Sequence, residues 1–387
     1  MALILLSAIL LCVAQLIPLP PVLWHALPGR ETFADPLISP PGDWRPWSLV
    51  PGATLNALYS LVVPFAILLL VSGLQDEQKN WTPTIVLAVI SLSLLVGLLQ
   101  FTGAGIVNPF VNGTPGAVDG MIANRNHFAL VLAIGLLIAP SWGVSAGRFS
   151  RVRAPAAFGL VLLLVLTILA SGSRSGIALG ATALLLGFVI SRRSITSALR
   201  RYPRWMRTTL AVGLITLIIV LILISVLANR AESINRLLDQ NSGEDLRARA
   251  LPTVLDIIRT YFPFGTGFGS FDPIFRVHEP FSMVQGVYFN HAHNDYLEIV
   301  LTSGLPGLII LLIAIGWWLR LSATAWRQDF PLPKLGSGAL FLIMLASLVD
   351  YPARTPVIMA MTMLGALWLA GQGSESNAPL PSTGRKL

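Results

Sequence analysis

The chain has 387 residues, of which 54% are hydrophobic and 11% charged, and its mean hydropathy is +0.73. These values exclude an ordinary soluble globular protein and indicate an integral membrane protein. A single cysteine excludes disulfides and cysteine-rich metal clusters within one chain. The net charge of +8 has to be divided between the two sides of a membrane before it indicates a partner, and we expect no nucleic acid.

Ten apolar runs follow one another along the chain, each long enough or nearly long enough to cross a bilayer as a helix. We therefore predict an all-α integral membrane protein with about ten transmembrane helices. The first run has no basic segment before it and no small-residue cleavage site after it, which favours a retained helix over a signal peptide. The runs lie at about 3–23, 55–74, 83–102, 127–145, 155–171, 176–191, 209–228, 299–319, 336–350 and 356–371.

Lysine and arginine are unevenly distributed between the two sets of connections that ten spans create. The connections 75–82, 146–154, 192–208 and 320–335 and the tail 372–387 carry them at roughly three times the density of the short connections on the opposite side. Because basic residues concentrate in cytoplasmic loops, we expect both termini to be cytoplasmic and the opposite face to lie outside.

The connection 229–298 is the only long one, and this topology puts it outside the membrane. It divides the chain into about seven transmembrane helices in 1–228, the loop 229–298, and about three helices with a cytoplasmic tail in 299–387. Within the loop, apolar side chains recur at spacings of three and four, which predicts an amphipathic helix over about 246–261 near the membrane surface. These side chains are Leu251, Val254, Leu255, Ile258 and Tyr261. Three alternating glycines after this helix indicate a tight irregular turn.

The stretch Phe289–Glu298 is a dense polar cluster at the start of an apolar run, and it contains two of the five histidines. Ionisable groups close to hydrocarbon cost free energy to keep there, so we interpret the stretch as the candidate reactive centre. Helical spacing would group His291 with Glu298 on one face and leave His293 on another.

Three interpretations of these two histidines stay open. A zinc site would need a third ligand from Asp295, Glu298, His278 or Glu279. Alternatively, the histidines cap a helix at the membrane interface. We favour the third interpretation, in which a neutral imidazole, positioned by a neighbouring amide or carboxylate, takes a proton from an acceptor hydroxyl.

Three arginines lie on the same predicted outer face as the histidines. Arg174 occupies a break of small residues between two apolar runs, and Arg247 and Arg249 open the predicted surface helix. Alternatively, Arg174 is an anchor at the membrane interface, and Arg247 and Arg249 belong to a solvated face of the helix. Arginine also holds phosphate oxygens through two parallel hydrogen bonds, so together with a histidine base they fit a lipid with an anionic phosphate headgroup.

Two shorter polar stretches also lie on this face. Arg125 and His127 open the fourth predicted span, either as a polar helix entry or as substrate contacts. Asp350 and Arg354 lie in the turn between the last two spans, and we expect them to pair with each other in a structural role.

Six segments, taken in order, resemble the superfamily of O-antigen ligases and O-antigen polymerases. The resemblance covers about residues 50–370. The segments are Asn124-Arg125-Asn126-His127-Phe128, Ser173-Arg174-Ser175-Gly176, Arg247, Pro263-Phe264-Gly265-Thr266-Gly267-Phe268-Gly269-Ser270-Phe271, His291-Ala292-His293-Asn294-Asp295-Tyr296-Leu297 and Ser303-Gly304-Leu305-Pro306-Gly307.

The resemblance implies a multispanning glycosyltransferase of the GT-C class in the bacterial inner membrane. Such an enzyme takes a glycan from an undecaprenyl-diphosphate carrier on the periplasmic side. It passes the glycan, with no metal and no cofactor, to lipid A core or another saccharide. Displacement of the diphosphate by an activated hydroxyl in a single step predicts inversion at the anomeric carbon.

The resemblance also implies roles for individual residues. Arg174 and Arg247 would bind the carrier diphosphate, with Arg249 so close in sequence that the contact could belong to either. His293 would be the base, ahead of His291. Asn294 and Asp295 join Arg125 and His127 as candidate substrate contacts.

Two alternatives remain for the function. A polymerase of the same superfamily differs only in its acceptor. A transporter or flippase for lipid-linked sugars belongs to another class, and it would predict charged or broken helices near mid-bilayer and paired repeat halves. The predicted spans contain almost no acids, which favours the enzyme.

Overall fold

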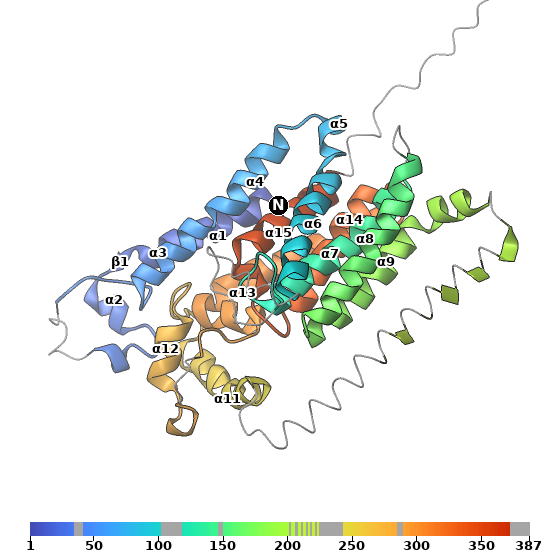
Figure 1. The fold of residues 1–387 in the computed structure, drawn as a ribbon. Helices are drawn as coiled ribbons and strands as arrows, with labels where there is room; N and C mark the ends of the chain where they lie inside the picture. Colours follow the sequence, from blue (N-terminus) through green and yellow to red (C-terminus); the bar gives the residue numbers. More distant parts are fainter. Residues whose placement is uncertain are drawn as a thin grey trace, which may run out of the picture.

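The computed structural model describes residues 1–34, 42–101, 118–145, 150–200, 243–284 and 289–371, with scattered residues between 203 and 223. Nearly all the regular structure in these residues is helical, and the long helices form one bundle (Figure 1). Within the described residues, six helices are long and apolar enough to cross a membrane. They are Pro51–Ser72, Glu77–Phe101, Arg125–Gly143, Val152–Ala170, Arg174–Ala198 and Asp295–Ala325. The prediction of an all-helical integral membrane protein is confirmed, while the number of crossings stays a prediction.

Helices occupy nine of the ten predicted apolar runs, and the tenth, 209–228, lies largely outside the described residues. In chain order the nine runs correspond to α1 (Ala2–Leu16), α3 (Pro51–Ser60) with α4 (Val62–Ser72), α6 (Thr82–Phe101), α7 (Arg125–Gly143), α8 (Ser150–Ala170), α9 (Arg174–Leu199), α13 (Asp295–Ala325), α14 (Pro331–Ala346) and α15 (Pro356–Ala370). The other α-helices of the described residues are α2 (Pro21–His25), α5 (Asp76–Lys79), α11 (Gly243–Tyr261) and α12 (Phe271–His278).

The first apolar run is shorter than its hydropathy predicts. Helix α1 ends at Leu16, and Ile17 is already extended, because Pro18 follows it and disfavours the helical conformation of the preceding residue. Pro18 and Leu19 form the two-residue strand β1, which pairs antiparallel with β2 (Arg45–Pro46). The sequence did not predict this strand pair.

Helix α7 is the centre of the bundle and packs against α6, α8, α9 and α14. Every residue from His127 to Ala139 is buried, so this helix is covered by protein on all sides. The side chain of Asn124 caps its first turn by accepting hydrogen bonds from the backbone N–H groups of Asn126 and His127. The cap fixes where α7 begins, and it therefore fixes the position of His127.

Helix α13 is broken inside its length at Gly304, whose φ is 59° and ψ is −145°. The break leaves carbonyl groups without helical partners, and the backbone of the glycine turn supplies those partners. Thr266 N–H donates to Leu301 O at 3.1 Å, and Gly267 N–H donates to Thr302 O at 2.8 Å. The predicted turn is confirmed, and these two hydrogen bonds hold residues 263–269 against the middle of α13.

Gln15 of α1 joins the same junction. Its side chain is fully buried; Nε2 donates to Thr302 O at 3.1 Å, and Oε1 accepts from Phe268 N–H at 2.9 Å. One amide thus ties together the first helix, the glycine turn and the broken helix α13.

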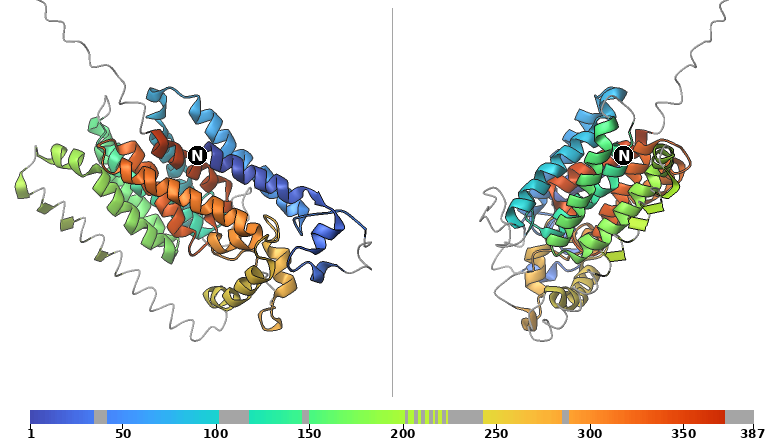
Figure 2. Two further views of the ribbon diagram at one scale, coloured as in Figure 1. Left: turned by 180° about the vertical axis from the view of Figure 1, so that it is seen from behind. Right: turned by 45° about the vertical axis from the view of Figure 1, so that its right-hand side comes forward.

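The helix predicted over 246–261 is present as α11. It lies across one end of the bundle, on the same side as α2 and α12 and opposite α5 (Figures 1 and 2). Its buried face contains Ala250, Val254, Ile257 and Tyr261, whereas the predicted face included Leu251 and Leu255, which are exposed. The buried stripe is rotated from the predicted one because α12 and the start of α13 cover α11 from that side. Contact of α11 with the membrane surface stays a prediction.

Gly304→Ala should destabilise the protein by about 2 kcal/mol or more, because a Cβ at this positive φ is strained and collides with the backbone carbonyl of Pro263. Gly316→Ala in the same helix is the matched control, since nothing lies within 4 Å of its added Cβ. Thermal unfolding in detergent measures both variants. Equal melting temperatures for the two would show that the break at Gly304 is not required.

Candidate active site

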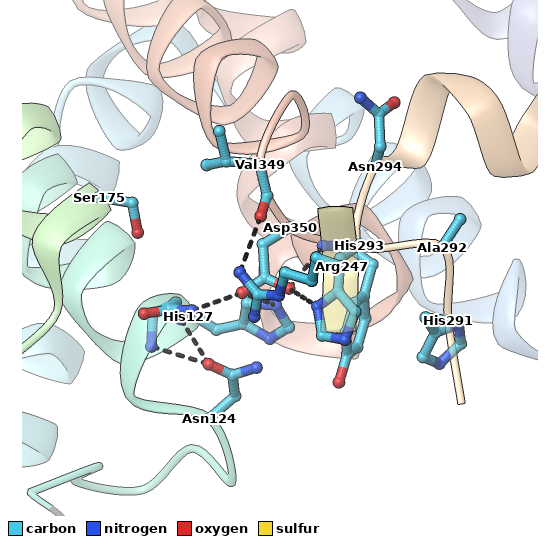
Figure 3. Close-up of polar contacts among 12 residues, drawn as sticks. Asn124, His127, Ser175, Arg247, His291, Ala292, His293, Asn294, Val349 and Asp350 are labelled. Carbon is cyan, nitrogen blue, oxygen red and sulfur yellow. Dashed lines mark hydrogen bonds and ion pairs between the residues drawn. The ribbon is translucent and has the colours of Figure 1, made fainter. Parts of the chain in front are cut away.

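Three segments that are distant in sequence meet at the end of the bundle where α11 lies (Figure 3). The first is the beginning of α7, the second is the extended stretch that precedes α13, and the third is the turn between α14 and α15. Their polar side chains converge on Asp350, which contributes the central carboxylate.

Asp350 and His293 form the direct carboxylate–imidazole pair of this cluster. His293 Nδ1 lies 3.1 Å from Asp350 Oδ1, and the same oxygen accepts the Tyr351 N–H at 3.0 Å. Asn126 Nδ2 donates to the other oxygen at 2.8 Å. His293 adopts a φ of 49°, a strained conformation that persists only where surrounding contacts enforce it. The backbone conformation and Asp350 therefore fix the position of this imidazole.

The Asp350 carboxylate is 2% exposed and carries its charge within this network. Burial alone would raise its pKa. The hydrogen bond from His293, the nearby His127 ring and the hydrogen bond from Asn126 together outweigh burial and lower the pKa to about 2. Asp350 is consequently an anion at any physiological pH and acts only as an acceptor.

His127 is the second imidazole at Asp350, with Nε2 3.8 Å from Oδ2. It is almost fully buried, and within the described residues neither ring nitrogen has a hydrogen-bond partner. An unsatisfied buried imidazole costs free energy, and whether His127 is a polar helix entry or a substrate contact stays a prediction.

His291 belongs to a separate ionic group. Its Nδ1 lies 2.9 Å from Glu298 Oε1, and the second oxygen of this fully buried carboxylate accepts the Ala292 N–H at 2.9 Å. The predicted grouping of His291 with Glu298 is thus found, although the residues between them are not helical until Asp295.

The expected pair of Asp350 and Arg354 does not form. Arg354 Nε lies 3.2 Å from Glu298 Oε1 and 3.4 Å from Asp295 Oδ1. The 3₁₀ turn Pro352–Arg354 separates the two residues, so that Asp350 faces α7 while Arg354 faces the first turn of α13. The buried carboxylates of Asp295 and Glu298 need a cation nearby, whereas Asp350 is already paired with His293 and Asn126.

Arg247 lines a cavity of about 680 Å³ beside His127 and Tyr351. Its Nη1 donates to Val349 O at 3.3 Å, next to Asp350. Arg249 extends elsewhere, with Nη2 donating to Ser282 O at 2.8 Å. The cavity is lined by Asp119, Ile122, Ala123, Asn124, Arg125, Asn126, His127, Arg247, Asn290, Tyr351 and Thr355. The sequence could not decide whether Arg247 or Arg249 contacts the diphosphate, and in the structure Arg247 lines the cavity and Arg249 does not.

Arg125 also lines this cavity, whereas Arg174 is not among its lining residues. Arg174 is the first residue of α9 and follows Ser173, whose hydroxyl donates to Asn126 Oδ1 at 2.8 Å. The beginning of α9 is thereby joined to the Asp350 network through Asn126.

Asn294 and Asp295 are both used in holding α13 to the end of α14. Asn294 caps α13 through Leu297 N–H and donates to Leu348 O at 2.9 Å, and its side chain points away from Asp350 (Figure 3). Asp295 Oδ2 accepts from Ser347 Oγ and from Ala353 N–H. These contacts give both residues a structural role, and their contact with substrate stays a prediction.

Within the described part of the chain, no three His, Cys, Asp or Glu side chains are grouped closely enough to hold a metal ion. His278, one of the ligands considered from sequence, instead lies 2.9 Å from the Tyr261 hydroxyl through Nε2.

Residues 159–312 match a family model described as O-antigen ligase. The chain carries an O-antigen ligase family domain. The resemblance stated from the motifs is confirmed for this domain, and the protein is a multi-pass membrane enzyme that contains it. The reaction of this family is the transfer of lipid-linked glycans. No curated protein matches the chain.

The match includes Arg174, Arg247 and the two histidines at 291 and 293, but not Asp350, Asn126 or Tyr351. Sequence reasoning gave no functional role to these last three residues. The sequence did contain one indication of such a role, which is the position of Asp350: this acid lies in a short turn between two apolar segments. An acid in such a place needs a partner, and the nearest arginine in sequence was the wrong choice.

Asp350→Asn should make the free energy of unfolding less dependent on pH in the acidic range. Because the folded pKa of about 2 lies below the ordinary 3.8, the carboxylate stabilises the fold by roughly 2 kcal/mol above pH 5, and this is lost as the pH falls from about 4 to 2. Unfolding midpoints of the asparagine variant should therefore fall less over this range. The exposed Asp256→Asn serves as control and should follow the wild type.

Arg247→Ala should weaken donor binding and lower transfer by about 10- to 100-fold, because it removes a cation from the cavity wall. Arg249→Ala, two residues away on the same helix, should change transfer by less than about threefold. Donor KM and kcat of both variants measure the difference. A larger loss for Arg249→Ala would contradict the assignment.

Proposed function

We propose that the protein transfers a glycan from an undecaprenyl-diphosphate carrier to lipid A core or another saccharide, at the periplasmic face of the bacterial inner membrane. The transfer inverts the anomeric carbon and needs no metal. Both termini are cytoplasmic in this proposal, which follows from the distribution of basic residues. The observation that carries it is the oriented pair of His293 and Asp350 beside a cavity that contains Arg247.

His293 is the base in this proposal. The anionic Asp350 accepts the hydrogen on Nδ1, which leaves the lone pair on Nε2 to take a proton. The carboxylate also stabilises the imidazolium that forms. His291 is less suited because its Nδ1 is committed to Glu298 and Arg354 shares that carboxylate.

The reaction is a single displacement. The acceptor oxygen attacks the anomeric carbon while its proton moves to His293 Nε2, and the bond from that carbon to the diphosphate oxygen breaks with both electrons going to the diphosphate. Attack from the face opposite the leaving group gives inversion.

Negative charge increases on the diphosphate as this bond breaks, and fixed cations stabilise it in a partly dehydrated site. Arg247 and Arg125 line the cavity and supply such cations. Arg174 is the third candidate for the diphosphate, at the adjacent beginning of α9. A cavity of about 680 Å³ is large enough for a diphosphate with one or two sugars.

Ligase and polymerase activities differ only in the acceptor, and reconstitution separates them from each other and from transport. The purified protein is placed in liposomes with labelled undecaprenyl-diphosphate glycan and each acceptor in turn. Discharge of the carrier only with lipid A core would establish a ligase, and a ladder of longer carrier-linked glycans a polymerase. Movement of the carrier across the bilayer without discharge would refute the proposal in favour of a transporter.

In the same liposomes, His293→Ala should lower transfer by about 10²- to 10⁴-fold, since the attacking hydroxyl loses its base. The protein should still fold and insert, as size-exclusion profile and thermal unfolding would show. His291→Ala is the comparison: it should lower stability, because Glu298 loses a partner, and retain more transfer than His293→Ala. Full transfer by His293→Ala would sink the assignment of the base.

A further inference from the structure

Tyr351 contacts all three imidazoles of the candidate active site. Its ring centroid lies 4.1 Å from that of His291, 5.0 Å from that of His293 and 5.2 Å from that of His127. The His291 ring is tilted 34° to the phenol ring, whereas the other two approach at 67° and 89°. One aromatic side chain therefore separates the His291 group from the His293 group.

The phenol ring is itself held at both ends. Its hydroxyl is hydrogen-bonded by the side chains of Asn290 and Asn124, and the Tyr351 N–H donates to the same Asp350 oxygen that binds His293. Burial raises the pKa of the hydroxyl, so it stays protonated. The ring is thus fixed relative to α7, to the stretch before α13 and to the central carboxylate.

His293 needs this kind of support. Its φ of 49° is strained, and a hydrogen bond at Nδ1 alone leaves the ring free to rotate about that contact. Tyr351 meets it edge-on, and Phe289 packs against it with ring centroids 5.2 Å apart. Two aromatic neighbours and one carboxylate together fix the imidazole.

We propose that Tyr351 is a positioning residue for the transfer reaction: its ring fixes His293 for proton abstraction and holds His291 apart from it. The inference rests on the proposed function, in which His293 is the base. Tyr351 lies outside the matched residues 159–312, so this role comes from the C-terminal part of the chain.

The charged or titratable groups around the two histidines are Asp350, His127 and Arg247 on the side of His293, and Glu298 with Arg354 on the side of His291. A variant that removes only the Tyr351 ring leaves all of these in the sequence, so its loss of transfer reports on the ring.

The test compares Tyr351→Phe, which keeps the ring, with Tyr351→Leu, which removes it, in the liposome transfer assay. The leucine variant should lose about 10- to 100-fold in kcat per folded enzyme, with donor KM changed by less than about threefold, because the base is misplaced while the cavity is kept. The phenylalanine variant should stay within about fivefold of the wild-type kcat.

Tyr296→Leu is the matched control, because Tyr296 lies in the first turn of α13 and donates to Met344 O, and in the described residues no ring contact joins it to a histidine. It should lower the amount of folded protein and leave kcat per folded enzyme unchanged. A merely structural Tyr351 would behave in the same way, with less folded enzyme and an unchanged kcat, and that result would overturn the inference. Failure of the wild type to transfer at all would instead overturn the proposed function.

Discussion

A buried carboxylate must be paired, and this constraint on Asp350 organises the candidate active site. Each oxygen of Asp350 is occupied, by His293 and the Tyr351 N–H on one side and by Asn126 on the other. Because Asn126 is also bonded to Ser173, satisfying this one group brings α7, α9, α13 and α15 to a common point. The requirement to pair one buried carboxylate thus assembles the candidate active site.

The two histidines of the polar cluster differ in what surrounds them. His291 faces a carboxylate that is fully buried and shared with Arg354, and this arrangement is typical of a structural ion cluster. His293 faces Asp350, whose neighbours Asn126 and Tyr351 line the cavity. Two histidines that are two residues apart in sequence therefore contact different carboxylates, because the backbone turns at His293.

Much of the fold could be predicted from the sequence, because a long apolar segment in a bilayer satisfies its backbone hydrogen bonds by forming a helix. The positions of Arg247 and His293 near a common site followed from their motifs. The predicted pairing of Asp350 with Arg354 was wrong, because the choice among Arg354, His127 and His293 depends on how α14 and α15 pack. The rotation of α11 was missed for a similar reason. Which side of α11 is buried depends on its contacts with α12 and α13, and the spacing of apolar residues within α11 does not reveal those contacts.

Gln15 shows how the order of synthesis bears on this enzyme. In the described residues its side-chain amide bonds only Phe268 and Thr302, which are translated more than 250 residues later. The first helix is therefore made with a polar group whose final partners do not exist until most of the chain has been translated. The docking of α1 onto the glycine turn and α13 cannot be complete before Thr302 has been made.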